Sequence, residues 1–287
     1  SIRPRNGWDH IKVSLDLALE FLEIALKGLE KTYKSTLKLS DFQVRAIMTA
    51  LEQSWFKKTS QDAMVITAGT GTGKTNGFVI PAIVDSMIDN WARYKAGIPN
   101  RRWSQLLLYP RHDLAIDQWQ TIRGVIGGIT KITKDIGEIS GVPIDNIVPT
   151  VQADSGGYLK WKQGQSPPIK KEESIIHSVQ QHYAGQGSSG SATNIIVAGL
   201  ESFKNRLLID DVVKKLRESL ERVVLDEIHL SEGLTGSHHA ALMRRLKAIA
   251  EINDKSTRKM FFIGCSATIA RPLRHVARIW YSDGSKS

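Results

Sequence analysis

The sequence predicts an α/β fold with a doubly wound, mostly parallel sheet, and three observations support it. Short apolar runs alternate with helical patterns along most of the chain, an order typical of a parallel sheet that helices cover on both faces. A glycine-rich stretch at residues 68–75 joins one apolar run to a helical pattern. Asp226 directly follows another apolar run, so we expect its side chain at the carboxyl edge of the sheet, where such folds bind ligands.

Two helices are expected before the first strand. Residues 8–33 carry apolar side chains at helical spacing, which predicts an amphipathic helix. Its predicted buried face consists of Trp8, Ile11, Leu15, Leu19, Leu22, Leu26 and Leu29. Ser40 is the expected N-cap of a second helix that runs to about Leu51. We therefore expect residues 1–38 to form a helical extension and residues 39–287 to form the main domain.

Six apolar runs are predicted to be strands. They cover residues 64–67, 105–109, 147–151, 194–198, 222–225 and 260–264. Two polar stretches break the alternation, one near residues 91–102 and one, rich in Gly, Ser and Gln, over residues 154–191. Stretches of that composition are typical of surface loops, so both are predicted to be insertions.

Composition predicts where the protein is located and what kind of partner it binds. No apolar run approaches the roughly 20 residues that cross a bilayer, and the amino terminus lacks the apolar core of a signal peptide; this predicts a cytoplasmic protein with no membrane partner. The 39 Lys and Arg against 29 Asp and Glu give a net charge of +10, which favours a polyanionic partner. Cys265 is the single cysteine, which excludes an internal disulfide, and we expect it to be a small buried side chain.

The stretch AGTGTGKT, residues 68–75, has the spacing of a phosphate-binding loop. Successive backbone N–H groups at a strand-to-helix turn can surround a triphosphate, and a Cβ in place of the glycines would block that approach. Lys74 is expected to reach the β- and γ-phosphates of ATP, and the Thr75 hydroxyl to bind Mg²⁺. The predicted nucleotide-binding set is Ala68, Gly69, Thr70, Gly71, Thr72, Gly73, Lys74 and Thr75.

The stretch RVVLDEIH supplies the acidic residues that such a loop requires. Asp226 is expected to hold Mg²⁺ together with Thr75, and Glu227 to accept a proton from the attacking water. An isolated acidic pair is more often an exposed turn, but its pairing with the loop favours the catalytic interpretation. A GTPase is disfavoured because the chain has no Asn-Lys-x-Asp motif.

Three motifs, AGTGTGKT, DEIH and SAT, occur in the order and contexts of the superfamily 2 helicases. The chain therefore resembles the first RecA-like P-loop domain of that superfamily. The resemblance implies that Gln43 reads adenine and that Lys74, Asp226, Glu227 and His229 are catalytic in a DExH-type ATP hydrolase. It also implies that His229 links the nucleotide site to the coupling residues, which are Ser266 and Thr268 of the SAT motif.

The same resemblance suggests where nucleic acid is bound. Residues 106–118 look like motif Ia, with Pro110 and Arg111 at the expected contact positions. Motif Ib normally offers a threonine to the strand, and this chain has Gly199 in that region. The expected contacts there come from the backbone, Ser202 and Lys204, and phosphate contacts make binding salt-dependent.

The line DEIHLSEGLTGSHHAALMRRL resembles the pattern of MrfA/YprA-type DNA helicases and of the DISARM antiviral helicase DrmA. This implies an ATP-dependent 3′-to-5′ DNA helicase or translocase in a bacterial defence or repair pathway, and we prefer the DISARM relative. It also implies a partner protein in a defence complex. The chain does not begin with Met and has no second RecA-like domain after SAT, so we expect a piece of a longer protein that hydrolyses ATP weakly when isolated.

Two alternatives remain at this stage. An RNA helicase would use the same motor motifs, because they hold the backbone and carry little base information. A nucleotide-gated scaffold in a multiprotein complex would keep the fold without unwinding. The stretch HLSEGLTGSHH lacks the i, i+4 histidine pair of zinc proteases, so His238 and His239 are expected to begin a helix rather than to bind metal.

Overall fold

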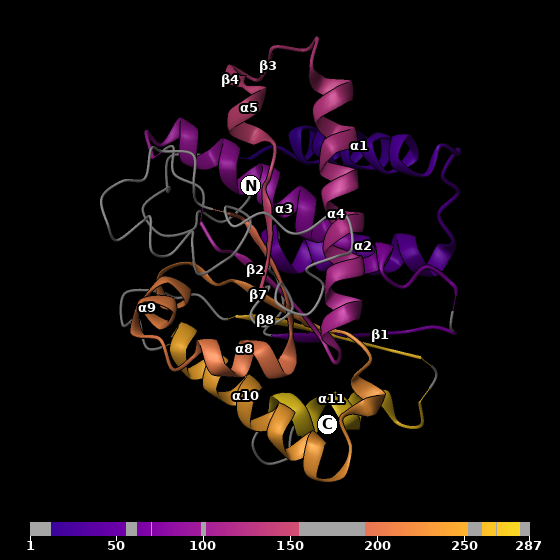
Figure 1. Cartoon of the computed structure of the whole chain (residues 1–287). Coiled ribbons are helices and arrows are strands. Elements are labelled where there is room, and N and C mark those ends of the chain that lie inside the picture. The colour runs from indigo at the N-terminus through magenta and orange to yellow at the C-terminus, as the bar shows by residue number, and fades with distance from the viewer. Residues whose placement is uncertain are drawn as a thin grey trace, which may run out of the picture.

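The computed structural model describes residues 13–55, 62–69, 71–98, 102–154, 193–251, 260–267 and 269–281. A six-stranded sheet lies at its centre, in the order β1-β8-β7-β2-β6-β5, with every neighbouring pair parallel (Figure 1). The strands are β1 (Ala63–Thr67), β2 (Gln105–Tyr109), β5 (Val151–Ala153), β6 (Ile195–Gly199), β7 (Arg222–Leu225) and β8 (Phe261–Ser266). Two short strands, β3 (Glu138–Ile139) and β4 (Val142–Pro143), form a separate antiparallel pair.

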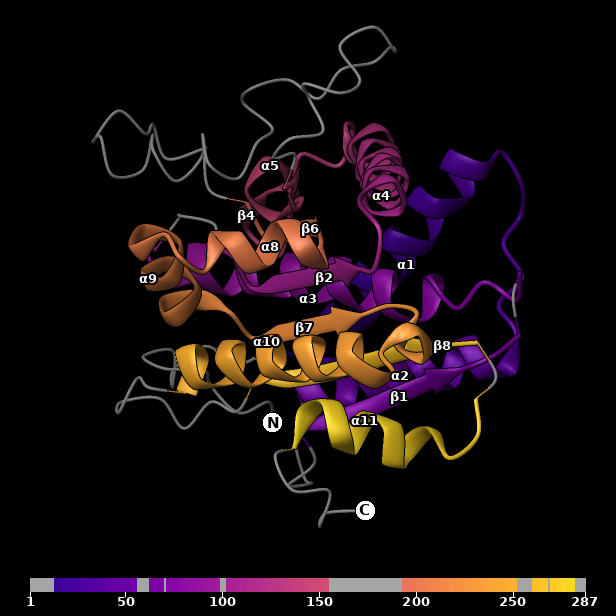
Figure 2. The same cartoon turned by 60° about the horizontal axis from the view of Figure 1, so that its bottom comes forward.

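Helices cover both faces of the sheet, so the predicted doubly wound α/β fold is confirmed. One layer holds α1 (Leu15–Tyr33), α2 (Asp41–Trp55), α3 (Asn76–Lys95), α4 (His112–Thr133) and α5 (Ile144–Ile147). The other layer holds α8 (Leu200–Arg206), α9 (Asp210–Ser219), the 3₁₀ helix η2 (Ile228–Leu230), α10 (Gly233–Glu251) and α11 (Pro272–Trp280), which Figure 2 shows in front of the sheet. None of the helices in the described part of the chain is long and apolar enough to span a bilayer.

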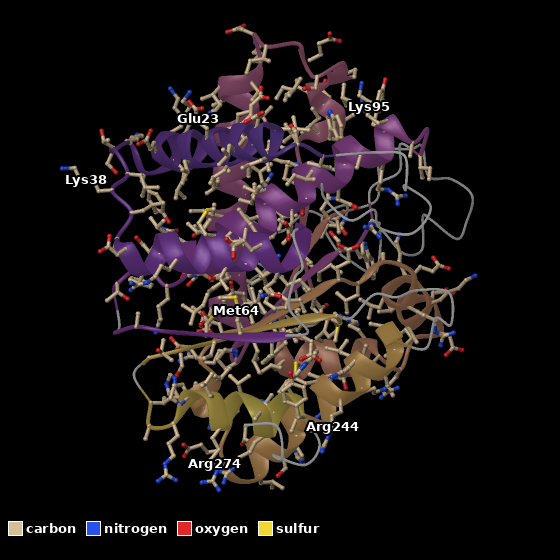
Figure 3. All side chains as sticks on the ribbon, turned by 180° about the vertical axis from the view of Figure 1, so that it is seen from behind. Glu23, Lys38, Met64, Lys95, Arg244 and Arg274 are labelled. Carbon is tan, nitrogen blue, oxygen red and sulfur yellow. The ribbon has the colours of Figure 1, made fainter. Side chains whose placement is uncertain are left out.

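Two hydrophobic cores result from this arrangement, one on each face of the sheet. Along β2, Leu107 and Tyr109 belong to the core under α3 and α4, and Leu106 and Leu108 belong to the core under α8 and α10. Strands that are buried on both faces give the near-continuous apolar runs that made them visible in the sequence. Figure 3 shows the two outer surfaces, with Glu23 and Lys38 on one side and Arg244 and Arg274 on the other.

The buried face of α1 differs from the predicted one. Leu15 and Leu19 are 53% and 46% exposed. Leu29 is buried as predicted, and Leu22 and Leu26 are partly buried. The other buried residues of α1 are Leu17, Phe21, Ile24, Ala25 and Gly28. A Cβ on Gly28 would lie 2.4 Å from Ile129 Cγ1, and one on Gly128 would lie 2.4 Å from the Gly28 carbonyl oxygen. The close crossing of α1 over α4 therefore needs glycine on both helices and sets which face turns inward; Trp8 and Ile11 lie outside the described residues.

Two element boundaries were also predicted wrongly. The strand expected at 147–151 begins only at Val151, because α5 ends at Ile147 and Pro149 has no N–H to give to a ladder. The insertion expected near 91–102 is shorter, since α3 continues to Lys95. Arg102 is buried in ion pairs with Asp89 and Glu221, both at 2.5 Å, instead of being exposed in a polar connection. Residues 155–191 of the second predicted insertion lie outside the described part.

Candidate nucleotide site at the carboxyl edge of the sheet

Strand register places Asp226 in a row of side chains at the carboxyl edge. Leu225 of β7 lies opposite Leu108 of β2, and the Asp226 N–H donates to the Leu108 carbonyl at 3.0 Å. The next residues along these strands are Asp226, Tyr109 and, on β8, Cys265. Paired positions in a sheet project from the same face about 4.8 Å apart. Asp226 is therefore flanked by Tyr109 and Cys265 on the face that α3 covers.

The glycine-rich loop has the backbone conformation that its sequence requires. Gly71 and Gly73 have φ values of +75° and +77°, in the left-handed region that glycine tolerates best. The Thr72 backbone N–H and hydroxyl both donate to the Gly69 carbonyl, at 3.4 and 2.7 Å. Thr70 lies outside the described residues. The turn ends at the amino terminus of α3, which favours an anion at this point.

Gln43 connects the start of α2 to this loop. Its Oε1 accepts hydrogen bonds from the Ser40 N–H at 2.8 Å and the Ser40 hydroxyl at 3.1 Å, which is half of a capping box and fits the predicted N-cap. Its Nε2 donates to the Gly73 carbonyl at 2.9 Å and to that of Thr72 at 3.4 Å. In this structure the residue predicted to read adenine therefore holds the loop.

Lys74 and Asp226 are both buried, and their charges interact. Each is 9% exposed, and Lys74 Nζ has no hydrogen-bond partner among the residues that the structure describes. Burial and the charge of Glu227 raise the pKa of Asp226 to about 6, and the charge of Lys74 opposes this rise. Burial and the charge of Asp226 raise the pKa of Tyr109 and of Cys265 well above their usual values.

These residues fit a nucleoside triphosphate with a divalent cation. A buried ammonium group without a protein partner is costly unless an anion accompanies it. Thr75, the N-cap of α3, makes no capping hydrogen bond with its side chain, so its hydroxyl is available as an oxygen ligand. Oxygen ligands from Thr75 and Asp226 suit Mg²⁺. Ala68 joins the loop to the SAT strand, because its N–H donates to the Ser266 carbonyl at 3.3 Å.

The turn after Asp226 holds Glu227 and His229 in a constrained conformation. Glu227 has a φ of +50°, uncommon for a residue with a side chain, and its N–H donates to Asp226 Oδ1 at 2.9 Å. His229 Nδ1 lies 3.2 Å from Glu227 Oε2 and 3.3 Å from Ser266 Oγ. The structure thus brings together the predicted general base Glu227, His229 and the coupling residue Ser266, while Thr268 lies outside the described part.

The candidate nucleic-acid residues lie at the ends of two neighbouring strands. Tyr109 of β2 pairs with Gly199 of β6, so Pro110 and Arg111 emerge beside Gly199. Arg111 is exposed and pairs with Asp113 at 2.6 Å, and this hydrogen bonding lowers the pKa of Asp113. Ser202 and Lys204 follow on α8, where Lys204 pairs with the exposed Glu201 at 3.0 Å.

His112 connects these two segments and was not predicted from the sequence. Its Nδ1 lies 3.3 Å from the Ser202 hydroxyl, and its Cα lies 3.3 Å from the position a Cβ would take on Gly199. Burial lowers its pKa. Glycine at 199 therefore leaves room for the His112 backbone, which explains locally why the usual threonine is missing.

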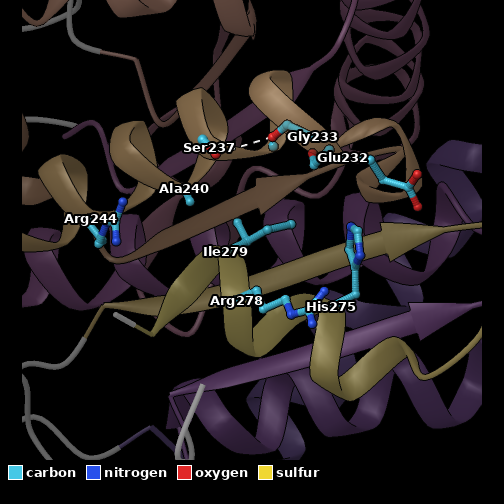
Figure 4. A pocket seen from close by; sticks show the side chains of 10 residues that line it. Glu232, Gly233, Ser237, Ala240, Arg244, His275, Arg278 and Ile279 are labelled. Atoms are coloured by element: carbon cyan, nitrogen blue, oxygen red, sulfur yellow. Dashed lines mark hydrogen bonds between the residues drawn. The ribbon is translucent and has the colours of Figure 1, made fainter. Parts of the chain in front are cut away.

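A groove lies next to the turn of residues 227–230, between α10 and α11 (Figure 4). It encloses about 560 Å³, and its lining includes Ser231, Ser237, Arg244, His275 and Arg278. Figure 4 shows His275 rising from α11 toward the segment of Glu232. His238 and His239, expected at a helix start, lie in α10, and His239 Nδ1 is 2.7 Å from the buried Ser231 hydroxyl.

Comparison with known proteins gives distant relatives of one kind. No family model matches the chain. The ATP-dependent helicase hrq1 of Schizosaccharomyces pombe is 25% identical over 224 residues, which cover 78% of this chain and 16% of that protein. The HRQ1 helicase of Saccharomyces cerevisiae is 42% identical over 57 residues, 20% of this chain and 5% of the relative. The chain therefore spans less than one fifth of the length of either relative.

Solved helicase structures share the fold. The DUF1998 helicase MrfA superposes with a TM-score of 0.56 at 22% identity, over 91% of this chain and 31% of that one. Mss116p bound to ssRNA and AMP-PNP gives a TM-score of 0.58 at 20% identity, over 97% of this chain and 44% of that one. MrfA bound to DNA gives a TM-score of 0.54 at 20% identity, over 98% of this chain and 29% of that one. The predicted resemblance is confirmed: the chain has the RecA-like fold of the superfamily 2 helicases.

Proposed function

We propose that this chain is the first motor domain of an ATP-dependent DNA helicase or translocase. The observation that carries the proposal is the buried Lys74 ammonium group, which interacts electrostatically with Asp226 and has no hydrogen-bond partner among the described residues. Burying an ammonium group without a hydrogen-bond partner is unfavourable, so a purely structural turn does not explain it. A triphosphate would supply the missing hydrogen-bond acceptors for this ammonium group.

The residues divide the work of hydrolysis as follows. Lys74 and the backbone N–H groups of residues 69–75 would bind the phosphates, with Gln43 on the base, and Thr75 and Asp226 would hold Mg²⁺. When bound, Mg²⁺ supplies positive charge against the charge that develops on the transferred phosphoryl group. Glu227 would accept the proton of the attacking water. His229 would transmit the state of the site to Ser266 and Thr268.

The rest of the motor lies elsewhere in the proposed full-length protein. Residues 1–38 would form a helical extension and 39–287 the first RecA-like domain, with a second such domain closing over the γ-phosphate. That domain would supply arginine side chains, which in phosphoryl transfer are worth about 10³-fold or more. The isolated chain would accordingly bind ATP and hydrolyse it slowly.

The proposed polymer is DNA, held at the Arg111 and Lys204 segments by its phosphates. The DNA complex of MrfA, whose fold this chain shares, supports DNA, and the ssRNA complex of Mss116p keeps RNA as the alternative. We propose a cytoplasmic role in a DISARM-type defence complex, with repair as the alternative pathway. A scaffold without unwinding is the remaining alternative.

The test is ATP hydrolysis by the full-length protein that contains this chain, measured side by side without nucleic acid and with single-stranded DNA, duplex DNA and RNA. Stimulation by DNA and not by RNA supports the proposal. Stimulation by RNA alone would assign an RNA motor. Equal activity in every arm, or none, would favour the nucleotide-gated scaffold.

The raised pKa of Asp226 predicts that the stability of the folded protein depends on pH. Its folded-state pKa of about 6 lies above the ordinary 3.8, so the native state binds more protons between these values and loses stability as the pH rises from about 4 to about 6. Two pKa units correspond to about 3 kcal/mol. In the absence of nucleotide, Asp226→Asn should be more stable than wild type at pH 7.5, by up to that amount.

Thermal or urea unfolding of both proteins between pH 4.5 and 7.5 checks this expectation. The stability difference should shrink as the pH falls through 6, because wild-type Asp226 then becomes neutral as well. A difference that stays constant over this range would contradict the raised pKa.

Arg111 predicts a change in the salt dependence of nucleic-acid binding. Each phosphate contact contributes a slope of about 0.7 for single strands to the plot of log K against log salt. Arg111→Gln should therefore lower the magnitude of that slope by about this amount. The matched control is Arg45→Gln on α2, an exposed arginine in the helical layer on the α3 face, which should leave the slope unchanged. Equal slopes for wild type and Arg111→Gln would show that Arg111 makes no phosphate contact.

A further inference from the structure

The turn that carries Glu227 depends on contacts from outside itself. Glu227 has a left-handed backbone, and the three-residue helix η2 that follows is stabilised by few internal bonds. The Leu230 N–H donates to the Glu227 carbonyl and the Ser231 N–H to the Ile228 carbonyl, both at 2.9 Å. A residue held in a sparsely populated conformation persists only where its surroundings fix it. The neighbours of the turn therefore decide where the Glu227 carboxylate lies.

His275 makes a direct hydrogen bond to this turn. Its Nε2 lies 2.6 Å from the Ile228 carbonyl oxygen. A carbonyl oxygen only accepts, so Nε2 carries the proton and donates. The carbonyl that it contacts belongs to the residue between Glu227 and His229 and also accepts the Ser231 N–H. One side chain of α11 thus holds the Ile228–His229 peptide, in the backbone between two proposed catalytic residues.

The helix that presents His275 is itself firmly packed. Val276, Ile279 and Trp280 of α11 are buried in the core that also lies under α8 and α10, and Trp280 stacks on Phe262 of β8 with ring centroids 4.7 Å apart. A Cβ on Gly264 would lie 2.9 Å from Val276 Cγ2, so α11 approaches β8 closely. His275 is consequently fixed relative to the strand that leads into Ser266.

We propose that His275 is a positioning residue for hydrolysis, which sets the Glu227 carboxylate through the Ile228 peptide. The inference rests on the proposed ATPase function. Among the described residues, His275 bonds to the Ile228 carbonyl and not to Glu227 or to the nucleotide-binding loop, so its loss should lower turnover and leave nucleotide affinity unchanged. Because α11 follows the SAT strand directly, the same bond gives that strand a second connection to the catalytic turn besides His229.

The experiment compares His275→Leu and His275→Gln in the full-length protein. Leucine fills the space and cannot donate, whereas the glutamine amide nitrogen can donate from a similar distance along the side chain. Arg278→Leu is the matched control, since Arg278 lines the same groove one turn further along α11. Steady-state kcat and KM, equilibrium binding of a fluorescent ATP analogue, melting temperature, and hydrogen exchange over residues 227–231 are measured for each.

We expect His275→Leu to lower kcat about 10-fold or more, since small displacements of reacting groups have effects of this size. Nucleotide affinity should be unchanged, exchange over residues 227–231 should be faster, and His275→Gln should restore most of both. Equal kcat in wild type and His275→Leu, with normal nucleotide binding, would overturn the positioning role. Loss in leucine and glutamine variants alike, accompanied by a lower melting temperature, would also overturn it in favour of simple packing. Wild type that binds no ATP would instead refute the proposed function itself.

Discussion

Replacing Lys74 by methionine should abolish ATP-dependent activity while making the nucleotide-free protein more stable. The ammonium group is buried without a hydrogen-bond partner in the described part of the chain, and a buried polar group in that state costs about 1 kcal/mol or more. Methionine keeps the length of the side chain and removes the charge, so the unfolding free energy should rise by roughly this amount.

Activity should change in the opposite direction. Without the ammonium group, the charge on the transferred phosphoryl group loses a preorganised partner, and removing one such group costs about 10²- to 10³-fold in kcat. ATP hydrolysis by the full-length protein and thermal unfolding without nucleotide are the two measurements. Lys95→Met is the control, since Lys95 is an exposed lysine at the carboxyl end of α3, the helix that follows the loop of Lys74. Wild-type activity in Lys74→Met would show that the Lys74 side chain is not needed for catalysis. An unchanged or lower stability of the variant would mean that the ammonium group has a stabilising partner in the wild-type protein.

Glu227→Gln should trap nucleotide without turning it over. Glutamine has the shape of glutamate but cannot accept the proton of the attacking water, and general-base catalysis contributes about 10²- to 10⁴-fold. The kcat should fall by that factor. The nucleotide affinity should be retained, because Lys74, Thr75 and Asp226 are untouched.

Rapid-mixing hydrolysis and equilibrium nucleotide binding by the full-length variant separate these two effects. Glu232→Gln is a suitable control, since Glu232 is an exposed glutamate five residues further along and lines the groove next to the turn. Normal turnover in Glu227→Gln would exclude Glu227 as the base. Loss of binding together with turnover would mean that Glu227 has a structural role in the site.

The parts of the molecule that could be predicted are those whose pattern is local. Lys74 and Asp226 each follow an apolar strand, and parallel strands bring their carboxyl ends to one edge, so their proximity follows from the sequence alone. The fold class follows from the same alternation. The candidate site residues that belong to sequence motifs could also be identified from the sequence, and their roles stay predictions.

The remaining features depend on contacts between distant segments. The buried face of α1 is set by the Gly28 crossing over α4, which helical periodicity cannot reveal. Arg102 is buried because Asp89 and Glu221, far apart in sequence, converge on it. His275 contacts a carbonyl 47 residues away, and no local signal marks such a bond.

The two ends of the segment 155–192 are fixed independently of what lies between them. On one side, Asp154 is buried and pairs with Arg206 at 2.8 Å. On the other, Asn194 exchanges side-chain hydrogen bonds with Asn90, at 2.8 and 3.2 Å. Asp154 follows the carboxyl end of β5 and Asn194 precedes the amino end of β6, so a replacement linker must run the length of the sheet, which takes about a dozen residues. Beyond that minimum, added length costs little, so domain insertion or loop grafting at this joint can reshape one surface of the protein while the candidate nucleotide site stays in register.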